Sequence, residues 1–421
     1  MRLVYCRQYG LCFLLCIAIC KPHILEQERI DDMSTIRANQ LEAWEKRVDT
    51  GVHFMLGNYA LVEGAISAGC NFFAGYPITP ANEISERMSQ RLPQVGGKFV
   101  QGEDELCSIF ALAGASLAGG KVMTATASAG FNYMQEGLGY CYTIEAPIVV
   151  ADVMRTRGDN FATYADVYQL RYGCSGDYEA IVLCPSSVQE LYDYTIWAFN
   201  LAEKYRNPVI VMSEATIALM RERLEIPAAD QIELFNRVYT SASPEDYLPF
   251  GAPANGCPDF APLGKGYHTI YSLNPHNEKG GIDWDPDDFE RLYRRICGKI
   301  RDNADDICRT ECYMMDDADY AIITYGSEVR PAIEAMQMAR ESGIKVGVLK
   351  LCNIWPVPEK AIRETAANVS KVFAVEMNMG RYVNEITRVV NGKCPVVPIT
   401  KNRGQIHTSA EILREIKEEV K

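Results

Sequence analysis

The chain has 421 residues, 48% of them hydrophobic and 23% charged, and its formal net charge at pH 7 is -13. A chain of this length folds into about two or three domains. The acidic balance argues against nucleic acid or an anionic membrane as the main partner, because both attract basic surfaces.

Residues 1–50 are interpreted as an N-terminal extension. Arg2 and Arg7 precede an apolar run over residues 11–20, which is the outline of a signal peptide and is too short to span a bilayer. The alternative is a start assigned too far upstream, because Met33 opens a polar segment typical of a protein N-terminus. Both explanations stay open at this point.

Most of the 15 cysteines stand singly inside apolar segments, as Cys70, Cys107 and Cys141 do. This pattern favours buried free thiols in a reducing cytoplasm over a secreted disulfide framework. The spacings lack the close cysteine run of an iron–sulfur site, and the five histidines form no metal motif. We therefore expect no cluster and no metal ligated by this chain itself.

Residues 51–235 alternate apolar strands with amphipathic helices. Strands are predicted at 71–76, 121–128, 146–154, 179–184 and 207–213, and helices at 81–92, 105–119, 132–144 and 187–205. Near-continuous hydrophobic strands between helices indicate a parallel sheet covered on both faces.

Residues 236–315 form a Pro/Gly-rich connection followed by a charged helix over 285–307. A second α/β unit is predicted over 316–421, in the order βαβαβα. Its strands are expected at 318–327, 345–351 and 371–378, and its helices at 328–343, 358–368 and 380–390. The sequence pattern thus predicts a larger α/β domain followed by a smaller one.

The segment GYPITP, residues 75–80, joins a strand to a helix through two prolines. Thr79 is predicted as the helix N-cap and Pro80 as the first helical residue. Such a helix start also favours anions. No phosphate loop, G-x-G-x-x-G fingerprint or G-x-S-x-G elbow is found, and the Gly-Asp-Gly…Asn pattern that binds diphosphate in thiamine enzymes is missing.

Several segments in order resemble one family. They are residues 57–80, 101–120 and 124–155, then 325–336 and 372–386. Together they are similar to the alpha subunit of 2-oxoacid:ferredoxin oxidoreductases, nearest to the 2-oxoglutarate type. The resemblance implies a thiamine-pyrimidine-binding domain followed by a smaller transketolase C-terminal-like domain, which agrees with the two α/β units.

The resemblance also implies the reaction. A 2-oxoacid is oxidatively decarboxylated to an acyl-CoA, and the electrons leave to ferredoxin. Thiamine diphosphate would be the cofactor and coenzyme A a co-substrate. Because this chain lacks the diphosphate motif and cluster cysteines, a beta subunit should hold Mg²⁺ and the diphosphate. Partner subunits, with gamma and delta subunits as candidates, should carry the iron–sulfur clusters.

By this resemblance, Glu105 is the carboxyl group that activates the cofactor at its pyrimidine ring. The alternative is an ordinary acidic residue in the first turn of a helix. Glu103 is the rival for the same role, and Tyr76, Pro77 and Ile78 are further cofactor-binding candidates.

Arg155 follows a predicted strand and is the candidate that binds the substrate carboxylate, since arginine offers two parallel donors to a carboxylate. Arg157 could take the same part, and Thr79 is expected near the same carboxylate.

Two loops depart from the family pattern. Residues 126–130 read TASAG where the family has T-S-G-P-G, and the segment after Arg155 lacks the usual R-G-G-P-S-T-G run. These differences leave another 2-oxoacid open, whether branched, aryl, pyruvate or oxalate. They also leave open a non-catalytic paralog, whereas the missing diphosphate motif disfavours a stand-alone transketolase-type enzyme.

Overall fold

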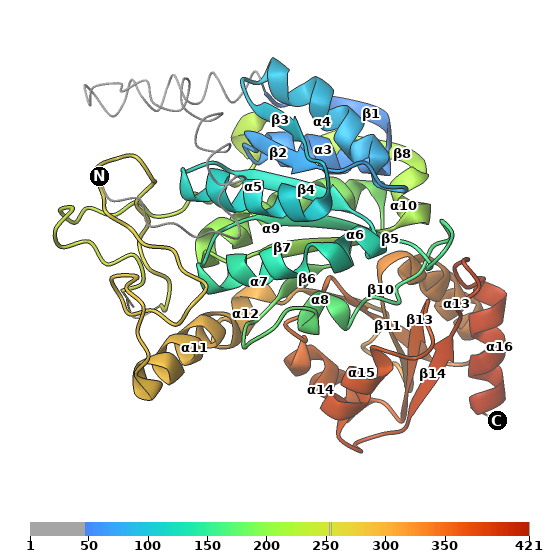
Figure 1. Cartoon of the computed structure of the whole chain (residues 1–421). Helices are drawn as coiled ribbons and strands as arrows, with labels where there is room; N and C mark the ends of the chain where they lie inside the picture. Colours follow the sequence, from blue (N-terminus) through green and yellow to red (C-terminus); the bar gives the residue numbers. More distant parts are fainter. Residues whose placement is uncertain (1–46, 252, 254, 421) are drawn as a thin grey trace.

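The computed structural model of the protein describes residues 47–251, 253 and 255–420. The signal-like segment and Met33 lie outside the described residues. Figure 1 shows a first unit, coloured blue to green, above a second unit, coloured orange to red.

The first unit is built on a seven-stranded sheet of order β12-β6-β7-β5-β4-β2-β3. Six of its strands are mutually parallel, which confirms the predicted parallel sheet. They are β2 (Phe72–Gly75), β3 (Lys98–Gln101), β4 (Val122–Thr126), β5 (Val149–Met154), β6 (Ile181–Leu183) and β7 (Val209–Glu214).

Helices cover both faces of this sheet. One face packs against α3 (Gly57–Ser67), α4 (Asn82–Gln94) and α9 (Val188–Tyr205), and the other against α5 (Glu105–Leu117), α6 (Ser128–Tyr133) and α7 (Gln135–Thr143). All six residues of β5 and of β7 are buried, as near-continuous apolar strands require. The first unit also holds α8 (Gln169–Tyr172), α10 (Ala215–Leu219) and the antiparallel pair β1 (Gly51–Leu56) and β8 (Arg221–Ile226).

The predicted helix over 132–144 begins earlier and is broken. It consists of α6 and α7, and Met134 stands between them. The first turn was missed because residues 121–128 read as one continuous strand, whereas β4 ends at Thr126.

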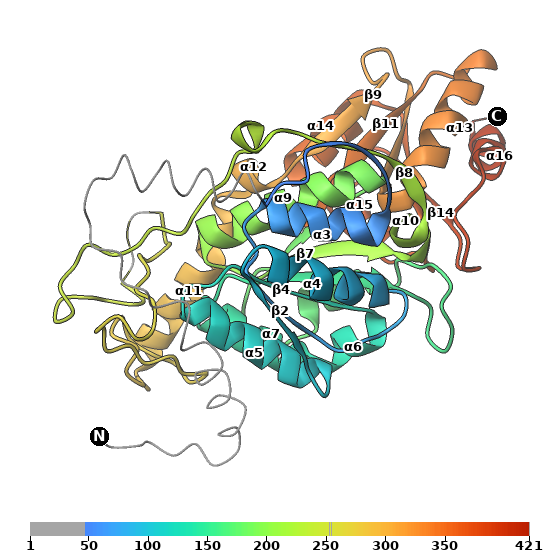
Figure 2. The same ribbon diagram turned by 90° about the horizontal axis from the view of Figure 1, so that it is seen from above.

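Residues 236–283, called the insert from here on, have little regular structure. The described residues of the insert form only two isolated β-bridges, Tyr239 to Phe260 and His276 to Ile282. In both views the insert extends from the end of the first unit that lies farthest from the C-terminal helix (Figure 1 and Figure 2). A short 3-10 helix (Ala229–Gln231) precedes it.

The insert leads into α11 (Pro286–Arg301) and α12 (Ala304–Ile307), where one helix over 285–307 was predicted. The side chain of Asp285 caps α11 by accepting hydrogen bonds from the main-chain N–H groups of Asp287 and Asp288. The helix stops because the Asn303 side chain donates to the Lys299 carbonyl and the Asn303 backbone leaves the helical conformation.

The second unit has a five-stranded sheet of order β14-β13-β10-β11-β9, in which only β9 is antiparallel. Its strands are β9 (Thr310–Tyr313), β10 (Tyr320–Tyr325), β11 (Val346–Leu351), β13 (Lys371–Glu376) and β14 (Val396–Thr400). Its helices are a 3-10 turn (Gly326–Glu328), α13 (Val329–Glu341), α14 (Glu359–Asn368), α15 (Val383–Val390) and α16 (Ser409–Glu419). The predicted α/β unit is present, and β9, β14 and α16 are additions to it.

The two units share a sheet. Strand β12 (Asn353–Trp355) leaves the second unit and pairs antiparallel with β6 of the first. Next to this pairing, the Cys184 N–H donates to the Cys352 carbonyl at 2.9 Å. One apolar core cluster contains residues of both units. The boundaries at 235/236 and 315/316 stay a prediction, but the two units do not pack as independent bodies.

Candidate active site

The predicted site residues follow β2, β3 and β5, and the altered loop of residues 126–130 follows β4, which lies between β2 and β5 in the sheet. Because these strands run in the same direction, the loops after them meet at one edge of the sheet, where α/β proteins bind ligands. Gly102 N–H donates to the Gly75 carbonyl at 2.9 Å and joins the loops after β3 and β2. The Ser128 hydroxyl bonds both the N–H and the carbonyl of Arg155 at 3.1 Å and joins the loops after β4 and β5.

Glu105 is the first residue of α5 and is only 8% exposed. Asp104 caps the helix by accepting a hydrogen bond from the Cys107 N–H at 2.6 Å, so Glu105 is not needed as a cap. Among the described residues, its carboxylate has no hydrogen-bond or ion-pair partner. A carboxylate that no described residue engages, at the sheet edge where α/β proteins bind ligands, is available to a ligand.

The Glu105 carboxylate can adopt its position only because residue 130 has no side chain. A Cβ atom at Gly130 would stand 2.2 Å from Oε1 of Glu105 and 2.2 Å from Oγ1 of Thr126. No side chain fits at that separation, so the two oxygens approach the main chain of α6 only because residue 130 is glycine. The sequence analysis noted residues 126–130 only as a departure from the family pattern and did not single out Gly130.

The segment of residues 76–80 differs from its prediction. Helix α4 begins at Asn82, and its N-cap is Ala81, which makes no side-chain capping bond. The prediction of Thr79 as N-cap and Pro80 as first helical residue is therefore wrong. A turn closed by the Ala81 N–H and the Ile78 carbonyl separates Thr79 from the helix, and Thr79 Oγ1 instead accepts a bond from the Asn82 side chain at 3.1 Å.

This segment is nevertheless held in place. The Asn58 amide, buried on α3, donates to the Pro80 carbonyl at 2.8 Å and to the Glu83 carboxylate at 2.9 Å. The Thr79–Pro80 peptide bond is cis. Tyr76 and Pro77 are exposed at this edge, whereas Ile78 and Thr79 are half-buried.

Arg155 is half-buried at the end of β5, and its Nη1 donates to the side-chain oxygen of Asn160. The loop closes on itself through a 2.8 Å bond from the Thr156 N–H to the Phe161 carbonyl. Arg157 and Glu103 are exposed. The structure thus separates the paired candidates: Glu105 is buried and Arg155 is half-buried, whereas Glu103 and Arg157 are exposed.

The altered loop after Arg155 is fixed to the second unit. The Tyr164 N–H donates to the Met377 carbonyl at 2.9 Å, and the Tyr164 hydroxyl accepts a bond of 2.9 Å from the Ser327 N–H. Asn378 donates to the Tyr164 carbonyl at 3.0 Å, and Trp355 donates to the Val167 carbonyl at 2.9 Å. This loop therefore couples the site edge to the smaller domain.

Asp152 is a polar residue of the site edge that the sequence analysis missed. It is fully buried on β5, in register with Thr126 of β4, and both carboxylate oxygens lack a hydrogen-bond partner in the described structure. Burial, together with the nearby Asp166, raises the pKa of Asp152 well above its usual range. The available signal was a single charged residue inside an apolar strand.

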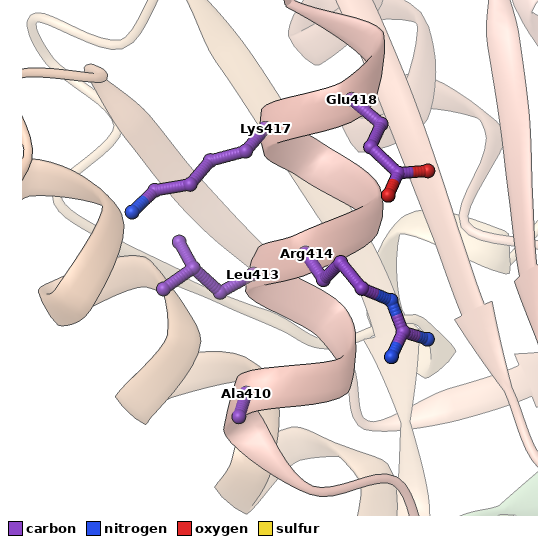
Figure 3. A pocket seen from close by; sticks show the side chains of 5 residues that line it. All are labelled: Ala410, Leu413, Arg414, Lys417 and Glu418. Atoms are coloured by element: carbon purple, nitrogen blue, oxygen red, sulfur yellow. The ribbon is translucent and has the colours of Figure 1, made fainter.

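The described residues were also compared with two other kinds of site, a metal site and a membrane-spanning helix. Among the described residues, no group of three or more His, Cys, Asp or Glu side chains gathers to hold a metal ion. Every helix in the described ranges is too short or too polar to cross a membrane. Figure 3 shows an open hollow on α16, lined by Ala410, Leu413, Arg414, Lys417 and Glu418, and it contains none of the site residues.

The fold and the site edge define a known class of α/β protein. Residues 63–292 match the family model described as pyruvate flavodoxin/ferredoxin oxidoreductase, thiamine diphosphate-binding, and residues 318–412 match pyruvate:ferredoxin oxidoreductase core domain II. The chain belongs to the pyruvate flavodoxin/ferredoxin oxidoreductase family. The predicted family, α/β fold class and oxidoreductase function are confirmed.

Three known proteins give the scale of the similarity. The chain is 43% identical to the 2-oxoglutarate synthase subunit KorA of Methanothermobacter marburgensis, over 87% of this chain and 99% of that protein. It is 36% identical to the ketoisovalerate oxidoreductase subunit VorB of the same organism, over 86% of this chain and 96% of that protein.

The solved structure of 2-oxoglutarate:ferredoxin oxidoreductase from Magnetococcus marinus, with 2-oxoglutarate, coenzyme A and succinyl-CoA bound, superposes with a TM-score of 0.83 at 30% identity. The superposition covers 88% of this chain and 66% of the Magnetococcus chain.

Proposed function

We propose that this chain is the alpha subunit of a complex that oxidatively decarboxylates 2-oxoglutarate to succinyl-CoA and CO₂ and passes the electrons to ferredoxin. The observation that carries the proposal is the Glu105 carboxylate, which is buried at the site edge and unpartnered in the described structure. The identity to the KorA subunit and the ligands of the Magnetococcus complex support 2-oxoglutarate as substrate.

The residues of the site edge fit the aminopyrimidine of thiamine diphosphate. Gly130 lets the Glu105 and Thr126 oxygens lie together against the main chain of α6, and Glu105 has hydrogen-bonding capacity that no described residue uses. When bound, thiamine diphosphate takes up the electron pair that decarboxylation releases. Glu105 would hold a proton against a ring nitrogen, and Tyr76, Pro77 and Ile78 would line the ring. Glu103 is too exposed to be preferred.

Arg155 is the candidate that binds the substrate carboxylate. It is half-buried, and Ser128 fixes its main chain, so its guanidinium starts from a defined position. A charge-assisted pair in such a place is worth about 1.5–3 kcal/mol. Thr79 would add a hydroxyl donor from the neighbouring loop, and Arg157 would steer the anion from outside.

The remaining parts of the machinery would come from partners. We infer a beta subunit that holds the diphosphate and Mg²⁺, and iron–sulfur clusters in partner subunits, which include gamma and delta candidates. The names of the relatives as subunits support a hetero-oligomer. The eleven described cysteines are all free, which supports the proposed cytoplasmic location.

A second substrate class has a specific observation behind it. The chain is also 36% identical to a ketoisovalerate oxidoreductase subunit, and its loop after Arg155 departs from the usual 2-oxoglutarate pattern. A branched 2-oxoacid is therefore the second candidate. A non-catalytic paralog remains the alternative from another class.

The test is a substrate panel on the co-expressed complex. Viologen reduction is measured with 2-oxoglutarate, pyruvate, 2-oxoisovalerate, phenylpyruvate and oxalate, each with and without coenzyme A. We expect 2-oxoglutarate to give the highest kcat/KM and to depend on coenzyme A. A higher kcat/KM for 2-oxoisovalerate would reassign the substrate, and no reduction with any 2-oxoacid would favour the paralog.

A further inference from the structure

The side chain of Arg206 is enclosed between the first unit and the insert. Arg206 ends α9 in a left-handed backbone conformation, with φ of 44°, and is only 1% exposed. Its Nη1 donates to the main-chain carbonyls of Pro249, Pro258 and Asp259 at 3.1–3.2 Å. Its Nε and Nη2 have no hydrogen-bond partner in the described ranges.

These two nitrogens form one edge of the guanidinium group. Their N–H bonds are parallel, which is the geometry that binds two oxygens of a carboxylate or a phosphate. Arginine cannot lose its proton in a protein, so burial leaves the charge in place. The Nε and Nη2 N–H groups of Arg206 are therefore two buried donors that lack an acceptor.

Hydroxyl groups of the insert lie in the same region. Tyr271 Oη and Thr269 Oγ1 are buried and lie within reach of each other, and neither oxygen has a further partner in the described structure. The Tyr271 ring packs 5.8 Å from the ring of Phe250, the residue after Pro249, whose carbonyl Arg206 binds. The carbonyl of Tyr271 in turn accepts a bond from Tyr140 of α7. The two hydroxyls and the arginine thus belong to one contact region between the insert and the first unit.

His276 adds an acceptor to this region. Its ring lies 4.0 Å from the Phe250 ring and it is 3% exposed. Its Nδ1 bonds the Asn274 carbonyl, so Nδ1 carries the hydrogen and Nε2 is left as an acceptor without a described partner. A hydrogen phosphate, which offers several acceptor oxygens and one hydroxyl, matches this set of groups.

Among the buried charged groups around Arg206, cations outnumber anions. The Glu145 carboxylate is already engaged by Arg295 and Lys299, and Lys299 also donates to the Arg206 carbonyl at 2.9 Å. Even if burial, which lowers the pKa of Lys299, removed its charge, two arginines would oppose one carboxylate. The neighbouring Arg237 is paired with Glu203 and adds no net charge. The region therefore carries buried excess positive charge.

We propose that Arg206, Tyr271 and Thr269 form a binding site for a small oxyanion, with phosphate preferred over a carboxylate, that fastens the insert to the first unit. The bound anion would neutralise the buried charge and accept from the free edge of Arg206. This site is separate from the residues assigned to 2-oxoacid chemistry, and its existence does not depend on the proposed substrate.

The test uses hydrogen exchange of the purified complex, followed by mass spectrometry on peptides that cover residues 262–283. Exchange is compared in phosphate, acetate and chloride at matched pH and ionic strength, for the wild type and for Tyr271→Phe. Tyr271→Phe removes only the hydroxyl and keeps the ring that packs against Phe250, so it should fold. The matched control is Tyr267→Phe, because the Tyr267 hydroxyl of the same insert already donates to the Ala242 carbonyl at 3.0 Å.

We expect phosphate to slow exchange of these peptides about 10-fold in the wild type and in Tyr267→Phe, acetate to slow it less, and chloride not to slow it. Tyr271→Phe should lose most of the phosphate effect. Equal exchange of the wild type in all three anions would overturn the proposal. An undiminished phosphate effect in Tyr271→Phe would also overturn it, because the anion would then bind elsewhere.

Discussion

Two buried glutamates, one in each unit, differ in how many hydrogen bonds their carboxylates accept. Glu376 at the end of β13 accepts hydrogen bonds from the Tyr325 hydroxyl, the Asn378 amide and the main-chain N–H groups of Tyr382 and Val383, at 2.8–3.0 Å. Glu105 at the start of α5 is buried almost as deeply and has no described partner.

The difference separates a structural carboxylate from a functional one. Glu376 supplies acceptors to the start of α15 and ties that helix to β13, so its charge stabilises the fold. Glu105 makes no comparable hydrogen bond in the described structure, so it contributes less to the stability of the fold. A carboxylate without a protein partner is expected where a ligand supplies the missing hydrogen bond.

The largest expected effect is on turnover in Glu105→Gln. If Glu105 exchanges a proton with the bound cofactor, the amide should lower kcat for the 2-oxoacid by about 100-fold to 10,000-fold. The thermal unfolding midpoint should not fall, because no described hydrogen bond is lost. Viologen reduction and thermal scanning of the same preparation measure both.

The control for that variant is Glu103→Gln, which changes an exposed carboxylate two residues away. It should keep kcat within about twofold of the wild type, since substitutions of exposed side chains that bind no ligand usually have small effects. A larger loss in Glu103→Gln than in Glu105→Gln would exchange the roles of the two residues.

The next effect is on substrate affinity. Arg155→Gln should raise KM for the 2-oxoacid about 10-fold to 100-fold, because a charge-assisted pair worth 1.5–3 kcal/mol is lost. Arg157→Gln, at an exposed position of the same loop, should raise KM by less than about threefold. Steady-state kinetics would contradict the assignment if both variants had equal KM values or if Arg155→Gln left KM unchanged.

Glu376→Gln tests the other side of the comparison. The amide keeps the shape but cannot accept all the existing bonds, so the free energy of unfolding should fall by about 2 kcal/mol. Urea unfolding measures this loss, while kcat per folded molecule should stay near the wild-type value. A stable Glu376→Gln variant with a large loss of kcat would instead place Glu376 in the chemistry.

The smallest effect is the pH dependence of stability in Asp152→Asn. Burial raises the pKa of Asp152, so the folded state binds a proton more tightly than the unfolded state does. The contribution of the Asp152 proton to the stability of the fold is complete below the ordinary aspartate pKa. It is lost as pH rises toward the raised pKa. The variant lacks this loss, so its stability relative to the wild type should increase as pH rises above the ordinary aspartate pKa.

Thermal scans across that pH range check this prediction against Asp230→Asn, whose side chain is exposed. That control should follow the wild type at every pH. If Asp152→Asn also ran parallel to the wild type, Asp152 would titrate like an ordinary exposed carboxyl group.

Local patterns were enough to predict most of the first sheet and the order of its helices. Runs such as residues 146–154 are apolar throughout because both faces of the sheet are covered, and that signal is contained in the segment itself. Glu105 and Arg155 could be proposed as site residues because the resemblance supplied their roles and the predicted parallel strands placed their loops at one edge of the sheet.

Features that depend on distant residues could not be predicted. Strand β12 joins the first sheet across more than 160 residues of sequence, and nothing within its three residues indicates that partner. The small size of Gly130 matters only because Glu105 points at it. The capping assignment of Thr79 failed because Asn82 and the turn before it, rather than a hydroxyl, define the start of α4.

The central claim is that Glu105 of this chain acts on bound thiamine diphosphate. The most direct measurement is the rate at which the C2 hydrogen of that cofactor exchanges with D₂O in the intact complex, followed by NMR after acid quench. We predict that Glu105→Gln slows this exchange by at least about 100-fold relative to the wild type and to Glu103→Gln. Equal exchange rates in all three proteins would contradict the account.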